Sequence, residues 1–376
     1  MNTFEKLKIL GANAKWDSCG GTEKKRTDIP PEFQPVVVDC ASSSESCRLM
    51  KVLQSNACVH DCNYCVNSCK SSPKAQLEPQ ETASVFLHLA RNNFVNGLFL
   101  TSAVTKNPEE SAEKIIESAE IIRARGWTGY VHLKVLPGMS KDQIFRMAEL
   151  ADRLSINIEA PSSSRFSELS STKDCKPDIV KRMRWIQEAL KKTEGVGRIA
   201  RKHTTQFVVG SCGETDLEYF NSIDKLYSDF GLHRAYYSAF SPVEQTCFSE
   251  KKAVPERREF RLYQSDFLYR TYGFELKELK LALDENGNLP LARDPKQSIA
   301  LQSPNEFPLN PNDAKREDLL KVPGIGPKTA DKILLLRNSK TISEFSELKE
   351  CGAILQKAIP FIDLGFGRQE SIFRFA

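Results

Sequence analysis

Three closely spaced cysteines are the residues of this chain that most clearly could do chemistry. The stretch Asn56-Ala-Cys58-Val-His-Asp-Cys62-Asn-Tyr-Cys65 has the pattern C-x3-C-x2-C. Cysteine thiolates hold iron–sulfur clusters, usually four of them for one [4Fe–4S] cubane. A loop that offers three thiolates therefore predicts a cluster with one iron left open to another ligand.

This cysteine stretch resembles the motif of the radical S-adenosylmethionine (radical SAM) superfamily, in which the residue before the third cysteine is aromatic, as Tyr64 is here. The resemblance implies a [4Fe–4S] cluster on Cys58, Cys62 and Cys65, with SAM chelating the open iron. It also implies that Tyr64 packs on the adenine of SAM, and that an electron donor such as flavodoxin or ferredoxin reduces the cluster.

Other uses of the cysteines stay open at this point. Zinc sites usually combine two C-x2-C pairs, and the sequence has no second pair. Cys69 could add a fourth thiolate, which would close the cluster and remove the SAM site. A second cluster on Cys19, Cys40 and Cys47 is disfavoured because no tight spacing links these residues.

Strands and helices alternate around this motif. Apolar or β-branched runs predict strands at 49–53, 97–101, 129–135, 155–159, 204–209 and 234–240. Amphipathic stretches predict helices at 82–94, 109–125, 142–154, 178–193, 216–230 and 256–272. Six β–α units in succession require a parallel sheet. The fold class is α/β, and the resemblance selects a partial (β/α)6 TIM-like barrel with the cysteine loop after its first strand.

Functional groups of parallel barrels lie at the carboxyl ends of the strands, which predicts further SAM contacts after the second, fourth and fifth strands. The superfamily has a Gly-Gly-Glu-like segment after the second strand, whereas this chain has Leu100-Thr-Ser-Ala103. Gly210 and Gly213-Glu214 match the superfamily's Gly-x-Ile-x-Gly-x-x-Glu element. The predicted cofactor-binding residues are Tyr64, Thr101, Ser102, Glu159, Arg165, Gly210 and Glu214.

For two residues near these strand ends, Arg165 and Cys212, a structural role is an alternative to the functional one. Arg165 could pair bidentately with the SAM carboxylate or could be a solvated loop residue. Cys212 follows the fifth strand and is the thiol that we predict to quench a product radical. The alternative is that Cys212 is simply a small buried residue in a turn.

The C-terminal region contains a second motif. In Leu320-Lys-Val-Pro-Gly-Ile-Gly-Pro-Lys328, prolines and glycines predict a tight turn between two helices. Backbone N–H groups at such a turn suit a phosphate oxygen. The stretch resembles the helix-hairpin-helix motif of DNA-binding proteins, with Gly324, Gly326, Lys321 and Lys328 as the predicted nucleic-acid contacts.

A weaker copy of this motif follows 28 residues later, with Leu348-Lys-Glu-Cys-Gly352 aligned on Leu320–Gly324. It has Ile354 in place of Gly326, which predicts a structural role. Residues 176–202 carry 9 Lys or Arg against 3 Asp or Glu, and could either extend a phosphate track or form a solvated face.

These patterns predict an irregular N-terminal extension over 1–45, a radical SAM barrel over 46–275, a linker or packed arm over 276–313 and a helix-hairpin-helix domain over 314–376. The net charge of +4 is too small to indicate a partner. No apolar run is long enough to cross a membrane, and the start of the chain does not resemble a signal peptide, so we expect a cytoplasmic protein.

The combination of motifs resembles predicted DNA-modification or DNA-repair radical SAM proteins. It implies an enzyme that acts on DNA through a 5′-deoxyadenosyl radical. Two other functions remain open, an RNA-modifying (tRNA) radical SAM enzyme and a non-catalytic iron–sulfur DNA-binding protein. The second is disfavoured because the cysteines lie far upstream of the helix-hairpin-helix.

Overall fold

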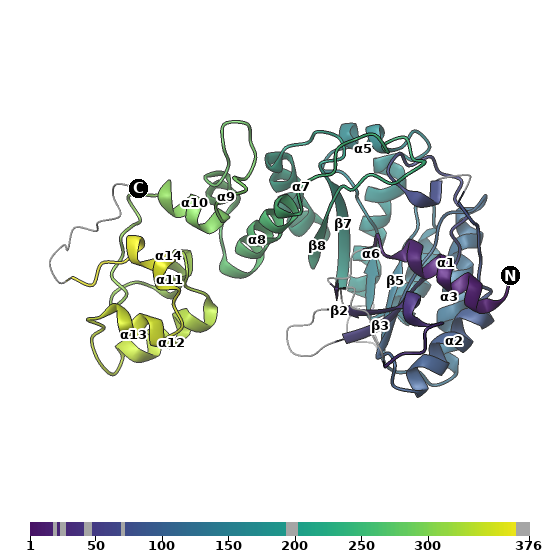
Figure 1. Ribbon diagram of the computed structural model, residues 1–376, viewed down its shortest axis with the longest axis horizontal. Helices are drawn as coiled ribbons and strands as arrows, with labels where there is room; N and C mark the ends of the chain where they lie inside the picture. Colours follow the sequence, from purple (N-terminus) through teal and green to yellow (C-terminus); the bar gives the residue numbers. More distant parts are fainter. Residues whose placement is uncertain (18–20, 23–27, 41–46, 69–71, 193–201, 366–376) are drawn as a thin grey trace. The chain divides into compact units, whose positions relative to one another are not determined.

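The computed structural model describes residues 1–17, 21–22, 28–40, 47–68, 72–192 and 202–365 (Figure 1). The chain forms two compact units, Met1–Glu214 with Ser222–Val254 and Thr215–Asn221 with Pro255–Ala376. No helix in the described part of the chain is both long and apolar enough to span a bilayer.

One eight-stranded sheet forms the centre of the first unit, and its strands follow one another in chain order. Strands β1 to β3 pair antiparallel and β3 to β8 pair parallel. The strands are β1 (Gly21–Thr22), β2 (Val37–Cys40), β3 (Cys47–Leu53), β4 (Gly97–Thr101), β5 (Tyr130–Lys134), β6 (Arg153–Ser155), β7 (Lys202–Val209) and β8 (Arg234–Ala239). Six parallel strands in an open sheet confirm the expected partial barrel.

Helices connect the parallel strands as the alternating pattern predicts. Helix α3 is typical, since Asn107 caps its first turn and its apolar face buries Ile115, Ile116 and Ile122. The helices of this region are α2 (Pro79–Arg91), α3 (Pro108–Ala124), α4 (Lys141–Leu150), α5 (Ser163–Leu169), α6 (Lys181–Lys192) and α7 (Asp216–Phe230), with a π-helical turn at Cys175–Val180 before α6.

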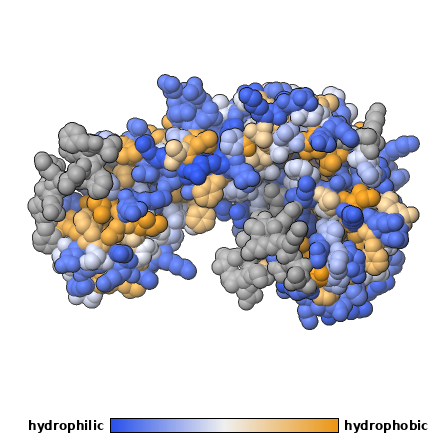
Figure 2. All heavy atoms as spheres, viewed as in Figure 1, coloured by the Kyte–Doolittle hydropathy of each residue, from blue (hydrophilic) through white to orange (hydrophobic). Residues whose placement is uncertain are grey.

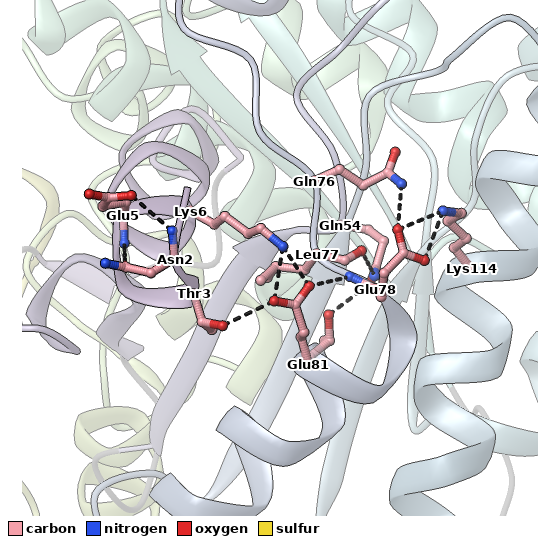
Figure 3. Close-up of polar contacts among 11 residues, drawn as sticks. Asn2, Thr3, Glu5, Lys6, Gln54, Gln76, Leu77, Glu78, Glu81 and Lys114 are labelled. Carbon is pink, nitrogen blue, oxygen red and sulfur yellow. Dashed lines mark hydrogen bonds and ion pairs between the residues drawn. The ribbon is translucent and has the colours of Figure 1, made fainter.

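The N-terminal region differs from the irregular extension that we expected. Residues Thr3–Ala14 form helix α1, which starts with a capping box of Asn2 and Glu5 and buries Leu7 and Leu10. Lys6 pairs with Glu81 of α2 at 2.7 Å, and Thr3 donates to the same carboxylate (Figure 3). The apolar face of α1 is narrow, which is why periodicity alone did not reveal it.

Strand β6 also differs from the prediction, because it covers Arg153–Ser155 rather than 155–159. Glu159 makes only an isolated bridge to Phe207 and has a φ of +61°, a left-handed value that interrupts a regular ladder. The apolar pattern continues beyond Ser155 because Ile156 and Ile158 are buried in the loop.

The second unit is helical. It contains α8 (Glu256–Tyr272), α9 (Leu276–Lys280), α10 (Pro295–Leu301), α11 (Arg316–Lys321), α12 (Pro327–Arg337), α13 (Phe345–Glu350) and α14 (Leu355–Ala358). Leu320, Ile333, Leu348 and other buried residues form its core. Apolar side chains also reach its surface, where Ile354 is exposed (Figure 2).

Part of the segment predicted to be a linker or a packed arm packs within this helical unit. The buried ammonium of Lys296 in α10 donates to the carbonyl of Ile325 at 2.6 Å, and Asp294 pairs with Lys357 of α14 at 2.7 Å. These two contacts tie the start of α10 to both hairpins.

The two hairpins pack against each other through Gly324. Its φ is +83°, and a Cβ at this position would lie 2.6 Å from the carbonyl oxygen of Ile354. The amide of Ile354 in turn donates to the carbonyl of Gly324 at 3.0 Å. Gly324 is therefore required by both its backbone conformation and the close approach of the second hairpin.

We predict that Gly324→Ala lowers the free energy of unfolding of the second unit by about 3 kcal/mol, from left-handed strain plus the clash with Ile354. The matched control is Gly273→Ala, since Gly273 has a φ of +76° and nothing within 4 Å of an added Cβ. This control carries the strain alone, about 1 kcal/mol. Urea unfolding checks both values, and equal losses would contradict the packing role.

Candidate active site

A cavity lies at the carboxyl ends of the parallel strands, with an empty volume of about 1130 Å³ that is partly open to solvent. The loop after β3 brings Cys58, Cys62 and Cys65 to its wall, together with Tyr64. The structure therefore places the three predicted cluster ligands and the predicted adenine contact in one chamber.

The cysteine loop is held by a carboxylate inside the motif itself. Asp61 accepts hydrogen bonds from the hydroxyls of Ser170, Ser171 and Thr172 and from two of their backbone amides. Partial burial opposes ionisation, but these hydrogen bonds outweigh it and keep the pKa of Asp61 well below its usual value. The cysteine loop is thereby fixed to a segment about 110 residues later in the chain.

This segment delivers Lys173 to the cavity. Its ammonium interacts electrostatically with the Cys62 sulfur and with the carboxylate of Glu159. Burial alone would lower the pKa of Lys173, but these negative groups outweigh burial and raise it, so the side chain stays protonated. Sequence spacing carried no signal for Lys173, because long-range contacts such as those of Asp61 and Asn63 bring its segment to the cysteines.

Glu159 lies opposite this cation. Its amide donates to Gln206 and its carbonyl accepts from Val208, so β7 holds its backbone on both sides. Tyr64 hydrogen-bonds to its carboxylate, and burial raises the pKa of both side chains. Within the described part of the chain, Oε2 of Glu159 is buried without a hydrogen-bond partner. A buried acceptor of this kind suits a ligand hydroxyl or amine.

The predicted residues after β4 also line the cavity. Thr101 is buried at the end of β4, and the hydroxyl of Ser102 donates to the carbonyl of Ala103 at 2.8 Å. The Ala103 amide donates to Ser55, which holds this turn against the end of β3. The turn presents small side chains and backbone groups where the superfamily has its Gly-Gly-Glu-like segment.

The other predicted contacts do not line the cavity. Glu214 is buried and accepts from the amides of Gly210 and Cys212, so its carboxylate closes the turn after β7. Arg165 donates to the Cys212 carbonyl at 2.9 Å. Burial raises the pKa of the Cys212 thiol to about 11. The SAM-binding roles of Arg165, Gly210 and Glu214 and the catalytic role of Cys212 stay predictions. In the structure, the contacts of these residues stabilise the turn after β7.

The donor set fits a [4Fe–4S] cluster better than a single metal ion. No three His, Cys, Asp or Glu side chains within the described ranges are close enough together to hold one ion. A cubane instead takes each thiolate on a different iron. Burial and the neighbouring Cys62 raise the pKa of the Cys65 thiol to about 12, so a bound cation is needed to hold these sulfurs as thiolates.

Four other cysteines were considered as possible cluster ligands, and the structure describes two of them. Cys40 and Cys47 are register partners across β2 and β3, and Cys47 begins the strand whose far end leads to the cavity. Cys19 and Cys69 lie outside the described residues, so a ligand role for either stays untested.

Comparison with known proteins decides the family of this region. The radical SAM superfamily profile matches residues 52–226. These residues form a radical SAM domain. Members of this superfamily are enzymes that bind a [4Fe–4S] cluster and SAM. The helix-hairpin-helix profile matches residues 310–336. No curated protein matches the chain.

Several solved structures are similar to this chain at low identity. They include the FeFe-hydrogenase maturase HydG from Carboxydothermus hydrogenoformans, at 14% identity and a TM-score of 0.43 over 56% of this chain and 48% of that one. Methylornithine synthase (PylB) has 13% identity and a TM-score of 0.45 over 56% and 59%. A second HydG structure has 10% identity and a TM-score of 0.46 over 80% and 78%. This chain thus spans about half of the first of these proteins.

The helix-hairpin-helix carries the predicted nucleic-acid contacts. Gly326 caps α12, and Lys328 is exposed in the first turn of that helix. Lys321 instead pairs with Glu278 at 2.6 Å and with Glu306 at 3.3 Å. Two acidic partners neutralise Lys321, which leaves Lys328 as the better placed of the two lysines for a phosphate. Residues 193–201 of the basic stretch lie outside the described residues.

We predict that Cys58→Ala, Cys62→Ala and Cys65→Ala each abolish the cluster, because each removes the ligand of one iron. Anaerobic reconstitution should give about four irons per chain for the unchanged protein, measured by iron analysis and by visible and EPR spectra. Cys69→Ala and Cys351→Ala should keep the cluster, and Cys351 is buried in the helical unit. Loss of the cluster in Cys69→Ala would show that four cysteines are required.

The cavity also predicts which cation receives the SAM carboxylate. Lys173→Met should weaken SAM binding by about tenfold, the scale of one charged hydrogen bond, because Lys173 lines the cavity. Arg165→Met should leave SAM affinity within about twofold, since Arg165 bonds to Cys212 instead. Calorimetric titration of SAM into cluster-loaded protein measures both. A larger loss of SAM affinity in Arg165→Met than in Lys173→Met would indicate that Arg165 binds the SAM carboxylate.

Proposed function

We propose that this protein is a radical SAM enzyme that modifies or repairs nucleic acid, with DNA as the substrate. One observation carries the proposal: a single chain combines a radical SAM cavity with a helix-hairpin-helix. When bound, the cluster and SAM supply a 5′-deoxyadenosyl radical, which can take hydrogen from an unactivated C–H bond.

The residues around the cavity support SAM binding. Lys173 offers a cation for a carboxylate, Glu159 offers a buried acceptor, and Tyr64 offers an aromatic ring beside the third cysteine. The turn at Thr101 and Ser102, which has small side chains, lines the same cavity and adds polar groups to it. These groups can orient an amino acid moiety and a nucleoside, the two parts of SAM.

The helix-hairpin-helix supports a nucleic-acid substrate. The start of α12 presents backbone N–H groups beside the exposed Lys328, an arrangement that suits a phosphate oxygen. Phosphate contacts position a duplex without reading its sequence. A base inside a duplex is shielded by stacking, so the reactive carbon must be flipped out or already unpaired.

Isotope transfer tests this proposal. Reduced, cluster-loaded protein is incubated with SAM and with uniformly deuterated duplex DNA that contains mismatches and lesions, and 5′-deoxyadenosine is analysed by mass spectrometry. We expect deuterium in 5′-deoxyadenosine. Cys62→Ala protein is the control and should give none, because its cluster is lost.

Binding measurements separate DNA from the other possible partners. Affinity for duplex DNA should fall steeply with salt, since neutralised phosphates release counterions. Lys328→Glu should weaken it more than Lys321→Glu, which replaces an already paired lysine. Tighter binding of tRNA and transfer of deuterium from tRNA alone would indicate an RNA-modifying enzyme. DNA binding with no SAM cleavage would indicate a non-catalytic iron–sulfur protein.

A further inference from the structure

The segment after α1 lies across the inner face of the half-barrel. The Lys15 carbonyl accepts from Lys51 of β3, and the Trp16 carbonyl accepts from Gln206 of β7 at 2.9 Å. Asp17 forms an ion pair with Lys134 of β5 and accepts from Asn157. Side chains from both ends of the parallel sheet thus hold this segment in place.

Contacts of α1, which precedes the segment, fix it further. Asn13 donates to the side chain of Asn67 at 3.0 Å, two residues after Cys65. At the other end of α1, Lys6 and Thr3 bind Glu81 (Figure 3). The segment is therefore a fixed wall of the cysteine cavity, which Asn13, Trp16 and Asp17 all line.

Trp16 contributes to this wall through its backbone, since its carbonyl accepts from Gln206. The residue as a whole lines the cavity and is 38% exposed. Lys15 Nζ lies 4.7 Å from the centroid of the ring. Because this ammonium lies over one face of the ring, the opposite face of the indole is the flat apolar surface that a ligand can stack on, with a charge suited to phosphate nearby.

The polar groups near Trp16 favour an uncharged ligand with both donors and acceptors. Asn13, Asn157 and Gln206 supply amide groups in this part of the cavity. Lys134 and Asp17 neutralise each other, so neither is available to pair with a charged amino acid substrate. A nucleobase has this character, because it is flat, uncharged and edged with donors and acceptors.

We propose that Trp16 is the stacking platform for a nucleobase brought into the cavity, with Lys15 beside the flanking phosphate. The proposal rests on the proposed function and specifies its substrate subsite as one for an extruded base. Loss of this stack should lower the fraction of bound duplex whose base is held in the cavity by about tenfold or more, the scale of alanine substitutions at base-stacking side chains. Overall duplex affinity should change little, because phosphate contacts outside the cavity supply most of it.

Photo-crosslinking tests the proposal directly. The probe is a 20-base-pair duplex with 5-iodouracil opposite a mismatched base, bound to full-length, cluster-loaded protein with SAM and irradiated in the ultraviolet. We expect the major adduct to map to Trp16 by mass spectrometry. Trp16→Ala should lower the crosslink yield at least tenfold while duplex affinity stays within about twofold. Trp16→Phe should retain most of the yield.

Trp185→Ala is the matched control. Trp185 also has cations over its ring, Lys181 at 5.0 Å and Arg182 at 5.1 Å, but it does not line the cavity. Its replacement should leave the crosslink yield unchanged. If the duplex binds and its adducts map away from Trp16, or survive Trp16→Ala, the stacking platform is wrong and the proposed function stands. If no variant or unchanged protein binds the duplex, the proposed function fails and this inference fails with it.

Discussion

Ionisable groups gather in one buried cavity, and the rest of the site depends on how their charges are balanced. Three cysteine residues, Glu159 and Lys173 line this chamber, and the charges of Cys62 and Glu159 both act on Lys173. Buried charges are tolerated only when they are paired or bind a metal. Asp61 positions Lys173, because it accepts hydrogen bonds from residues 170–172, which directly precede Lys173 in the chain. The spacer residues of the cysteine motif therefore organise the cavity as well as separating the ligands.

The parallel sheet explains why these groups meet. Each of β3 to β8 ends at the same edge, so the residues that follow them face one another although long helices separate them in the chain. The segment at Trp16 adds a wall that the barrel does not supply, held by side chains from several strands. Asn13, Trp16 and Asp17 thereby line the same cavity as the three cysteines.

In the helical unit, the two hairpins support each other and are held by α10 as well. Gly324 meets Ile354 of the second hairpin, and Lys296 holds the carbonyl of Ile325 from α10. The turn that suits a phosphate is thus a rigid feature, which lowers the entropic cost of binding. The second hairpin has Ile354 where the first has Gly326. It packs against the first hairpin, which agrees with the structural role that the sequence indicated.

The sequence by itself determined the α/β class, the helix-hairpin-helix and the bounds of β4, α7 and α8, because these follow from local spacing and periodicity. It predicted Cys58, Cys62 and Cys65 as cluster ligands, and the three residues line one cavity. It also singled out Glu159 from its place after a strand. Only the tertiary structure decided that Lys173 and Trp16 share the cavity while Arg165 and Glu214 do not. Lys173 arrives through the hydrogen bonds of Asp61, and Trp16 through contacts to three distant strands and the loop after β6. Such contacts join residues far apart in the chain, and no local pattern encodes which of many polar side chains will meet.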